Sequence, residues 1–368
     1  MKLEKYLGEV HIIEKDKSMD TSINKQYNKA AKFPRSWKVV LTSIFLLTVF
    51  QLASAQQAEQ EWLDIELSNY RYPYQVEFLK LEVQNQELNM GYMDVKPDMP
   101  NGKNVLLLHG KNFNGAYWRE TIQHLTENGY RVIVPDQIGF GKSTKPEHFH
   151  YTFQQLAMNT KVLLDSLKID QISVLGHSMG GMLATRFALM YPSVTEKLIL
   201  ENPIGLEDWK LKVPYQPVEW WYENELEKDY EQIKAYQMES YYHGDWKEEY
   251  DEWVRLLAGW TLNSDYDRIA WNAALTYDMI FTQPVLYEFG ELQMPTLLII
   301  GTDDRTALGK PLVDEEIRKS MGLYDELGKK TRDAIPNAEL TEIPGVGHLP
   351  HIQRFDEFIK PLLDFLAR

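Results

Sequence analysis

Ser178 lies in the stretch GHSMG, which fits the pattern G-x-S-x-G. The apolar run ISVL precedes this stretch, and the helix-forming run MLATRFALMY follows it. In that context the pattern predicts a sharp turn from a strand into a helix, with the serine side chain projecting from the turn. Such a turn strains the serine backbone and leaves room only for small residues two positions before and two positions after the serine. We therefore predict that Ser178 is a nucleophile rather than a small packing residue.

A serine hydroxyl needs a base to take its proton and a carboxylate to orient that base. The stretch GTDD follows the apolar run PTLLII and offers Asp303 and Asp304. The commoner spacing, with the acid three residues after the glycine, favours Asp304. Two carboxylates after the preceding predicted strand, Glu207 and Asp208, are weaker alternatives.

The stretch PGVGHLPH offers two histidines that could act as the base. His348 follows a predicted strand and a glycine, so its loop can be exposed while its side chain reaches inward. His351 follows a proline at the expected start of the last helix. We favour His348 for its position after the strand and the glycine. Ser178, Asp304 and His348 then occur in the chain order expected for this pattern.

Two backbone N–H groups are predicted to stabilise the oxyanion that forms when a serine attacks a carbonyl carbon. One belongs to Met179, at the start of the helix after the serine, and the other to Lys111, in the loop after NVLLLHG. His109 is expected to brace that loop, and His177 is assigned no role. No cofactor and no metal site is predicted.

The elements that would position these residues are visible as apolar runs. Residues 74–97 alternate apolar and polar side chains, which predicts an antiparallel pair of strands. Buried strands are then expected at NVLLLHG, RVIVPD, QISVLG, EKLILENP, PTLLIIGTDD and AELTEIPG, with helical stretches between them. This alternation predicts an α/β fold with a mostly parallel, doubly wound sheet, closed by a helix at FDEFIKPLLDFLAR.

One long segment interrupts the alternation of strands and helices. About 90 residues separate Glu201 from the strand at Pro295, which is too long for a structureless loop. Aromatic and leucine side chains recur there at helical spacing, at Trp246, Tyr250, Trp253, Leu257 and Trp260. We interpret residues 204–292 as an inserted helical cap, between a core of residues 56–203 and a second core part of residues 293–368.

Composition and the N-terminus bear on partners and location. The 368 residues carry a formal net charge of −15, which argues against a nucleic-acid binder, and they include no cysteine. The basic stretch KAAKFPRSWK, the apolar run after it and the sequence ASA predict a signal peptide in residues 1–55 and an exported protein. The alternative is a membrane anchor at residues 37–55, which would be the only contact with a membrane.

These motifs together resemble the α/β-hydrolase superfamily over residues 75–368. The matching pieces are LLLHGKNFNGAYW, VIVPDQIGFGKSTKP, GHSMGG, GTDD and GVGHLP. Epoxide hydrolases and haloalkane dehalogenases share the second piece but use an aspartate nucleophile, where this chain has Ser178. Proline iminopeptidases usually carry tryptophan where this chain has Met179. One departure is the stretch Gln353-Arg354-Phe355, where relatives often have Glu-x-Pro, and it leaves the local helix start open.

The resemblance implies a serine hydrolase that acts on an ester or related carbonyl compound. The tryptophans and tyrosines of the predicted cap suggest a small, hydrophobic molecule as substrate. The alternative within this family is a hydrolase of carbon–carbon bonds in a diketone-like substrate, which would use the same three residues. A catalytically silent binding protein on the same fold is a third interpretation, because fold alone does not fix function.

Overall fold

A sheet of eight strands forms the centre of the computed structural model, which describes residues 62–368. The predicted signal peptide or anchor therefore lies outside the described residues. The strand order is β1-β2-β4-β3-β5-β6-β7-β8. The strands are β1 (Val76–Val83), β2 (Gln86–Val95), β3 (Asn104–Leu108), β4 (Arg131–Pro135), β5 (Ile172–His177), β6 (Thr195–Glu201), β7 (Thr296–Gly301) and β8 (Ala338–Ile343).

The directions of the strands confirm the predicted α/β fold. Strand β2 pairs antiparallel with both β1 and β4, and every other neighbouring pair is parallel. The β1–β2 hairpin turns at Gln84 and Asn85, whose φ angles of 53° and 61° match the turn type that follows the twist of paired strands. The sheet is thus mostly parallel with an antiparallel edge.

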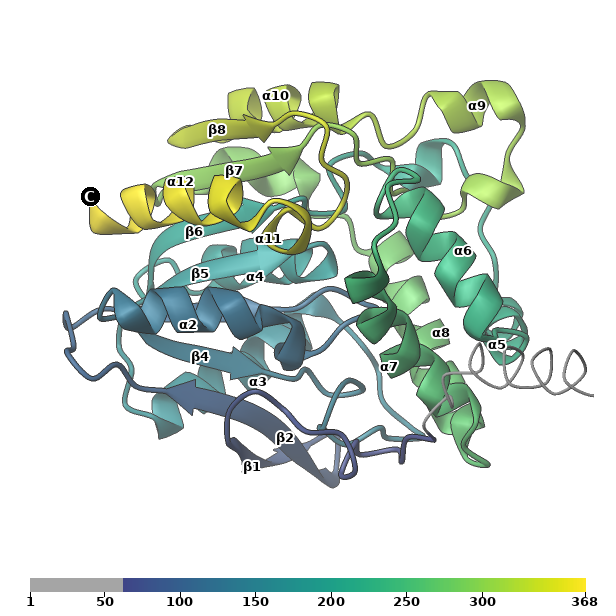
Figure 1. The fold of residues 1–368 in the computed structure, drawn as a ribbon, viewed down its shortest axis with the longest axis horizontal. Helices are drawn as coiled ribbons and strands as arrows, with labels where there is room; N and C mark the ends of the chain where they lie inside the picture. Colours follow the sequence, from purple (N-terminus) through teal and green to yellow (C-terminus); the bar gives the residue numbers. More distant parts are fainter. Residues whose placement is uncertain (1–61) are drawn as a thin grey trace, which may run out of the picture. The chain divides into compact units, whose positions relative to one another are not determined.

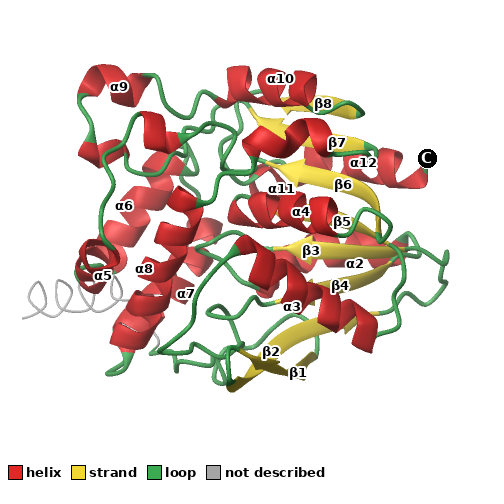
Figure 2. Ribbon diagram, turned by 180° about the vertical axis from the view of Figure 1, so that it is seen from behind, coloured by secondary structure: helices red, strands yellow, loops and turns green. Residues whose placement is uncertain are grey.

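Helices cover both faces of the sheet (Figures 1 and 2). Helices α2 (Arg119–Glu127) and α12 (Phe355–Ala367) lie over one face, and α3 (Phe153–Ser166), α4 (Met179–Met190) and α10 (Tyr324–Ala334) over the other. Successive side chains of a strand point to opposite faces. The buried residues of β3 accordingly alternate between the two cores, so the continuous apolar runs reflect a sheet buried on both sides.

The segment between β6 and β7 is helical, and it lies beyond one end of the sheet (Figure 1). It contains α5 (Val218–Leu226), α6 (Tyr230–Ser240), α7 (Asp251–Thr261) and α8 (Tyr266–Thr282), with short 3₁₀ turns at Trp209–Leu211, Glu248–Tyr250 and Leu286–Glu291. The helical character predicted for this segment agrees with these elements. The exact bounds of the cap, residues 204–292, stay a prediction.

The prediction that Trp246 and Tyr250 belong to the same helix as Trp253 is wrong. Trp246 and Tyr250 precede α7, which begins at Asp251. Lys247, between the two aromatic residues, is extended with φ −120° and ψ 150°, so no continuous helix joins Trp246 to Tyr250. The two aromatic rings pack edge to face with centroids 5.8 Å apart. Their spacing reflects this packing rather than a helix.

The C-terminal part also contains the short helices α9 (Glu315–Lys319) and α11 (Pro350–Gln353) and the 3₁₀ turn Lys310–Leu312. The helix start that the sequence left open falls at Phe355, after a break at Arg354 with φ −142° and ψ 62°. The Gln353 side chain accepts a hydrogen bond from the Gly347 N–H at 2.9 Å, which ties this break to the histidine loop. None of the helices within residues 62–368 is long and apolar enough to cross a membrane.

Candidate active site

Ser178 occupies a strained turn between β5 and α4. Its φ of 58° and ψ of −122° lie outside the regions that non-glycine residues normally adopt. The turn is held by hydrogen bonds from the Ser178 N–H to the Glu201 carbonyl at 3.2 Å and from the Gly181 N–H to the Ser178 carbonyl at 2.9 Å. The surrounding structure therefore fixes the conformation that the G-x-S-x-G pattern predicted.

The glycines on either side of Ser178 are required by close backbone approach. A Cβ atom on Gly176 would overlap the carbonyl oxygen of Gly180, and one on Gly180 would overlap the carbonyl oxygen of Leu108. Backbone atoms cannot rotate out of the way as a flexible side chain could. The turn can therefore form only with glycine at both positions.

His348 and Asp304 come together at the ends of neighbouring strands β8 and β7. The Nδ1 atom of His348 lies 2.6 Å from Oδ2 of Asp304, and neither side chain is exposed to solvent. Oδ2 of Asp304 also accepts a hydrogen bond from Nδ2 of Asn202 at 2.8 Å, and Oδ1 accepts one from the Thr306 N–H at 2.7 Å. A buried carboxylate held by several donors can fix the imidazole in one orientation.

The alternative acids make their contacts elsewhere. The Asp303 carboxylate accepts a hydrogen bond from the Thr302 hydroxyl at 3.1 Å. Glu207 accepts from Lys212 Nζ at 2.8 Å and from the Gly322 N–H at 2.7 Å, and Asp208 accepts from the Tyr287 hydroxyl at 2.7 Å. Among the four carboxylates weighed from the sequence, the structure therefore brings Asp304 to His348.

The alternative base, His351, is paired with a different acid. Oε1 of Glu201 accepts hydrogen bonds from the His351 N–H at 2.9 Å and from Nδ1 of its ring at 2.8 Å. The His351 ring also stacks on Trp118, with centroids 4.4 Å apart. His351 is thus a buried residue that packs against Trp118, and the Glu201 carboxylate holds its ring.

His177 has contacts that the sequence did not reveal. Burial, followed by the neighbouring histidines, lowers its pKa well below the usual value, so the ring is neutral. Nε2 donates to the His348 carbonyl at 2.8 Å, which leaves Nδ1 to accept from the Tyr117 hydroxyl at 3.0 Å. That hydroxyl in turn accepts from the Gly110 N–H at 3.0 Å. The chain of bonds links the loop after β3 to the loop that carries His348.

The predicted oxyanion donors border the serine. A Cβ atom on Gly110 would lie only 3.0 Å from the Ser178 Cβ, which places the loop of Lys111 directly beside the serine. Met179 is the first residue of α4, where the backbone N–H has no partner within the helix. His109 braces the loop as expected, because its Nδ1 bonds the Gly110 carbonyl at 2.9 Å.

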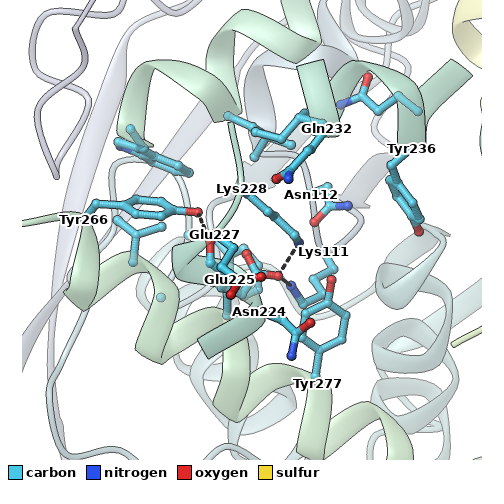
Figure 3. Close-up of a pocket in the computed structure, with 18 residues that line it drawn as sticks. Lys111, Asn112, Asn224, Glu225, Glu227, Lys228, Gln232, Tyr236, Tyr266 and Tyr277 are labelled. Carbon is cyan, nitrogen blue, oxygen red and sulfur yellow. Dashed lines mark hydrogen bonds and ion pairs between the residues drawn. The ribbon is translucent and has the colours of Figure 1, made fainter. Parts of the chain in front are cut away.

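A cavity of about 420 Å³ opens at Ser178, and an adjoining cavity of about 340 Å³ extends it between the helices. Both are lined by Lys111, Glu225 and Lys228. Figure 3 shows the two lysine side chains converging on the Glu225 carboxylate. From the sequence, only the backbone of Lys111 is expected to act in the site. No local pattern marks this cluster, because Glu225 and Lys228 lie far from Lys111 in the chain.

Burial and neighbouring charges shift the pKa values of this cluster. Burial lowers the pKa of the Lys111 ammonium to about 7, and the Glu225 charge offsets this effect only in part. For Lys228, burial is outweighed by the charge and hydrogen bond of Glu225, and its pKa is raised. Burial alone would raise the pKa of Glu225, but the charges of Lys228 and Lys111 lower it overall. Residues 62–368 contain no group of three or more acidic or histidine side chains arranged to hold a metal ion.

Comparison with known proteins agrees with this architecture. A family model described as "alpha/beta hydrolase fold" matches residues 103–355. The 2-hydroxy-6-oxo-6-phenylhexa-2,4-dienoate hydrolase of Burkholderia cepacia is 30% identical over 277 residues, which are 73% of this chain and 90% of that protein. The 2-hydroxy-6-oxononadienedioate/2-hydroxy-6-oxononatrienedioate hydrolase of Comamonas testosteroni is 29% identical over 286 residues, with the same coverage of 73% and 90%.

A solved structure is more similar still. The crystal structure of a "probable hydrolytic enzyme" from Pseudomonas aeruginosa PAO1 is 50% identical, with a TM-score of 0.82, and the match covers 84% of this chain and 99% of that chain. The resemblance drawn from the sequence motifs is thereby confirmed. The chain belongs to the alpha/beta hydrolase fold family.

Proposed function

We propose that this hydrolase cleaves an ester or related carbonyl compound through an acyl-enzyme on Ser178. His348 takes the proton of the Ser178 hydroxyl as its oxygen attacks the carbonyl carbon. Asp304 holds the imidazole in the required tautomer and stabilises the imidazolium that forms. The backbone N–H groups of Met179 and Lys111 stabilise the oxyanion.

The proton then returns from His348 to the leaving alkoxide, and the acyl group remains on Ser178. In the second half of the reaction, His348 takes a proton from water, whose oxygen attacks the acyl carbon. Collapse of the second oxyanion releases the carboxylic acid, and the proton returns to Ser178. The residues named here supply every proton acceptor and donor that the two steps require.

The observation that carries this proposal is the state of the two ring nitrogens of His348, together with the place of its ring beside the Ser178 cavity. Nδ1 is held by Asp304 at 2.6 Å, while the buried Nε2 has no hydrogen-bond partner within residues 62–368. The His348 ring stacks on Tyr241, with centroids 4.8 Å apart, and Tyr241 and Ser178 line the same cavity. An imidazole with one nitrogen oriented and the other available is what a general base for Ser178 needs.

The substrate is proposed to be a small molecule with an apolar group. The walls of the Ser178 cavity include three tryptophans, Trp209, Trp220 and Trp221. Such walls favour aliphatic or aromatic groups, because apolar surface leaves water on binding. The predicted cap, residues 204–292, contributes all three.

Labelling with a fluorophosphonate probe tests the nucleophile. The wild-type protein is expected to be labelled on Ser178, and the Ser178→Ala variant is expected to give no labelled band. Ser173→Ala is a matched control, because Ser173 is also buried but lies within β5. Labelling that persists in Ser178→Ala would exclude Ser178 as the nucleophile.

Hydrolysis of a carbon–carbon bond is the second candidate, and the two named relatives favour it. Both are named as hydrolases of unsaturated 2-hydroxy-6-oxo acids. Parallel assays of p-nitrophenyl esters and of 2-hydroxy-6-oxo-6-phenylhexa-2,4-dienoate separate the two candidates. A kcat/KM for the dienoate at least a hundredfold above that for every ester would favour the carbon–carbon reaction, and the reverse ratio would favour the ester reaction.

A further inference from the structure

The charged lining of the Ser178 cavity is unbalanced. Its charged side chains are Lys111, Glu225 and Lys228, two cations against one anion. The chain as a whole has a formal net charge of −15, so a positive cavity runs against its composition. The remaining walls of this cavity are aromatic, aliphatic or neutral. The adjoining cavity adds one carboxylate, Glu227, and that residue is exposed to solvent.

One carboxylate oxygen faces both ammonium groups. Lys228 Nζ makes a close ion pair with Oε1 of Glu225, and Lys111 Nζ lies 3.9 Å from the same oxygen. That separation is too long for a hydrogen bond. Lys111 Nζ lies 3.5 Å from the centroid of the Tyr277 ring, and it donates no hydrogen bond to any of residues 62–368. Its side chain is only 9% exposed, so water can replace the missing partners only from inside the cavity.

An ion pair that served only to stabilise the fold would not need both Lys111 and Lys228. Glu225 and Lys228 already form a pair, and adding a second buried ammonium costs free energy unless another acceptor meets it. The lowered pKa of Lys111 shows that Glu225 compensates this cost incompletely. The excess positive charge therefore points to an anion that enters the cavity.

We propose that Lys111 and Lys228 bind a carboxylate carried by the substrate, at a distance from the carbonyl group that Ser178 attacks. The inference rests on the proposed function and narrows its substrate class to acyl compounds that carry an anionic group as well as an apolar one. When Lys111 is protonated, the carboxylate balances the excess positive charge of Lys111, Lys228 and Glu225, and its oxygens accept the hydrogen bonds that the Lys111 ammonium lacks. The tryptophan walls contact the apolar part of the same molecule.

The kinetic test compares two esters of equal chain length, mono-p-nitrophenyl adipate, which is anionic, and p-nitrophenyl hexanoate, which is neutral. The measured quantity is the ratio of kcat/KM for the adipate to that for the hexanoate. Lys228→Gln is expected to lower this ratio about tenfold or more, because a charge-assisted hydrogen bond is lost. Glu225→Gln is expected to raise the ratio, because it removes the competing carboxylate.

Two further variants serve as controls. Lys228→Arg keeps the positive charge and is expected to hold the ratio within about threefold of the wild-type value. Lys247→Gln removes a lysine that is 44% exposed and does not line the cavity, and the ratio is expected to stay unchanged. A ratio that stays constant in both Lys228→Gln and Glu225→Gln would overturn the anion site, even if both variants lose activity through damage to the fold.

A binding measurement separates failure of the anion site from failure of the proposed function. Calorimetry on Ser178→Ala compares 4-phenylbutyrate with the neutral 4-phenylbutanamide, and the carboxylate is expected to bind more tightly. Adding Lys228→Gln is expected to abolish the difference. If neither ester is cleaved but this preference is present and depends on Lys228, the anion site stands and the proposed esterase does not. If the esters are cleaved and no preference exists in either assay, the anion site is wrong and the proposed function stands.

Discussion

Asp304 holds His348 through the same oxygen atom that accepts a hydrogen bond from Asn202. Oδ2 lies 2.6 Å from His348 Nδ1 and 2.8 Å from Asn202 Nδ2. Asn202 is itself fixed, because its Oδ1 accepts from the Gly301 N–H at 2.8 Å. The Asp304 carboxylate is thus held by Asn202, at the end of β6, as well as by its own place after β7. A fixed carboxylate in turn fixes the orientation of the His348 ring.

Asp304→Asn is expected to lower kcat by about 10⁴ with little change in the fold, because an amide cannot hold the imidazole tautomer that accepts the serine proton. The measurement is the steady-state hydrolysis of p-nitrophenyl hexanoate. Asp303→Asn is the matched control, since that carboxylate contacts Thr302 instead. Equal losses in the two variants would contradict the assignment of Asp304 as the orienting acid.

Tyr117→Phe is expected to destabilise the protein by about 1–3 kcal/mol. The hydroxyl is the link between the Gly110 N–H and His177 Nδ1, and all of these groups are buried. Its loss leaves one donor and one acceptor without a partner. Urea unfolding followed by circular dichroism measures the change.

The control for this variant is Tyr287→Phe, whose side chain is 66% exposed and whose hydroxyl bonds Asp208 at the surface. Its effect should remain within about 0.5 kcal/mol. If the two tyrosine variants are equally stable, the hydroxyl of Tyr117 does not support the site in the way the hydrogen bonds indicate.

Much of the fold could be predicted because its signals are local. A strand that is buried on both faces must be a short continuous apolar run, and each of the runs from NVLLL to AELTEI became a strand of the sheet. The turn at Ser178 was equally readable, because glycines at 176 and 180 are required wherever a serine projects from such a turn. Residues at successive strand ends then meet at one edge of the sheet.

The rest of the site depends on contacts between distant parts of the chain. The His177 ring is fixed by hydrogen bonds with the Tyr117 hydroxyl and the His348 carbonyl, and no local sequence pattern predicts either bond. The pairing of Lys111 with Glu225 requires knowing how the helices after β6 lie against the loop after β3. Charged side chains in a helical segment usually face solvent, so sequence alone gave no reason to place Glu225 in a cavity.

Gly180→Ala is expected to destabilise the protein by at least about 1–3 kcal/mol, because the added Cβ would overlap the Leu108 carbonyl oxygen. Relief requires a backbone shift at the start of α4, so fluorophosphonate labelling of Ser178 should slow as well. Gly290→Ala is the matched control, since a Cβ there meets no atom within 4 Å. Thermal unfolding that is the same for both variants would refute the steric requirement.

The charge of the Ser178 cavity is expected to change with pH through Lys111. Its pKa is lowered to about 7, chiefly by burial. The pKa of Lys228 is raised and that of Glu225 is lowered, so both stay ionised between pH 6 and 9. Burial raises the pKa of the nearby Tyr277 well above its usual value, so that phenol stays neutral. Above pH 7 the cluster therefore loses its excess positive charge.

Binding of 4-phenylbutyrate to Ser178→Ala should accordingly weaken as the pH rises from 6 to 9. A carboxylate that raises the Lys111 pKa by about one unit on binding corresponds to a dissociation constant about tenfold larger at the high end. Calorimetry in buffers of different ionisation enthalpy should also show that binding takes up a proton near pH 7.5, because the bound carboxylate favours the charged lysine. The Ser178→Ala, Lys111→Met double variant keeps every other titratable group, so the part of the pH dependence that it lacks belongs to Lys111. A pH dependence that is identical in the two proteins would show that Lys111 does not bind the anion.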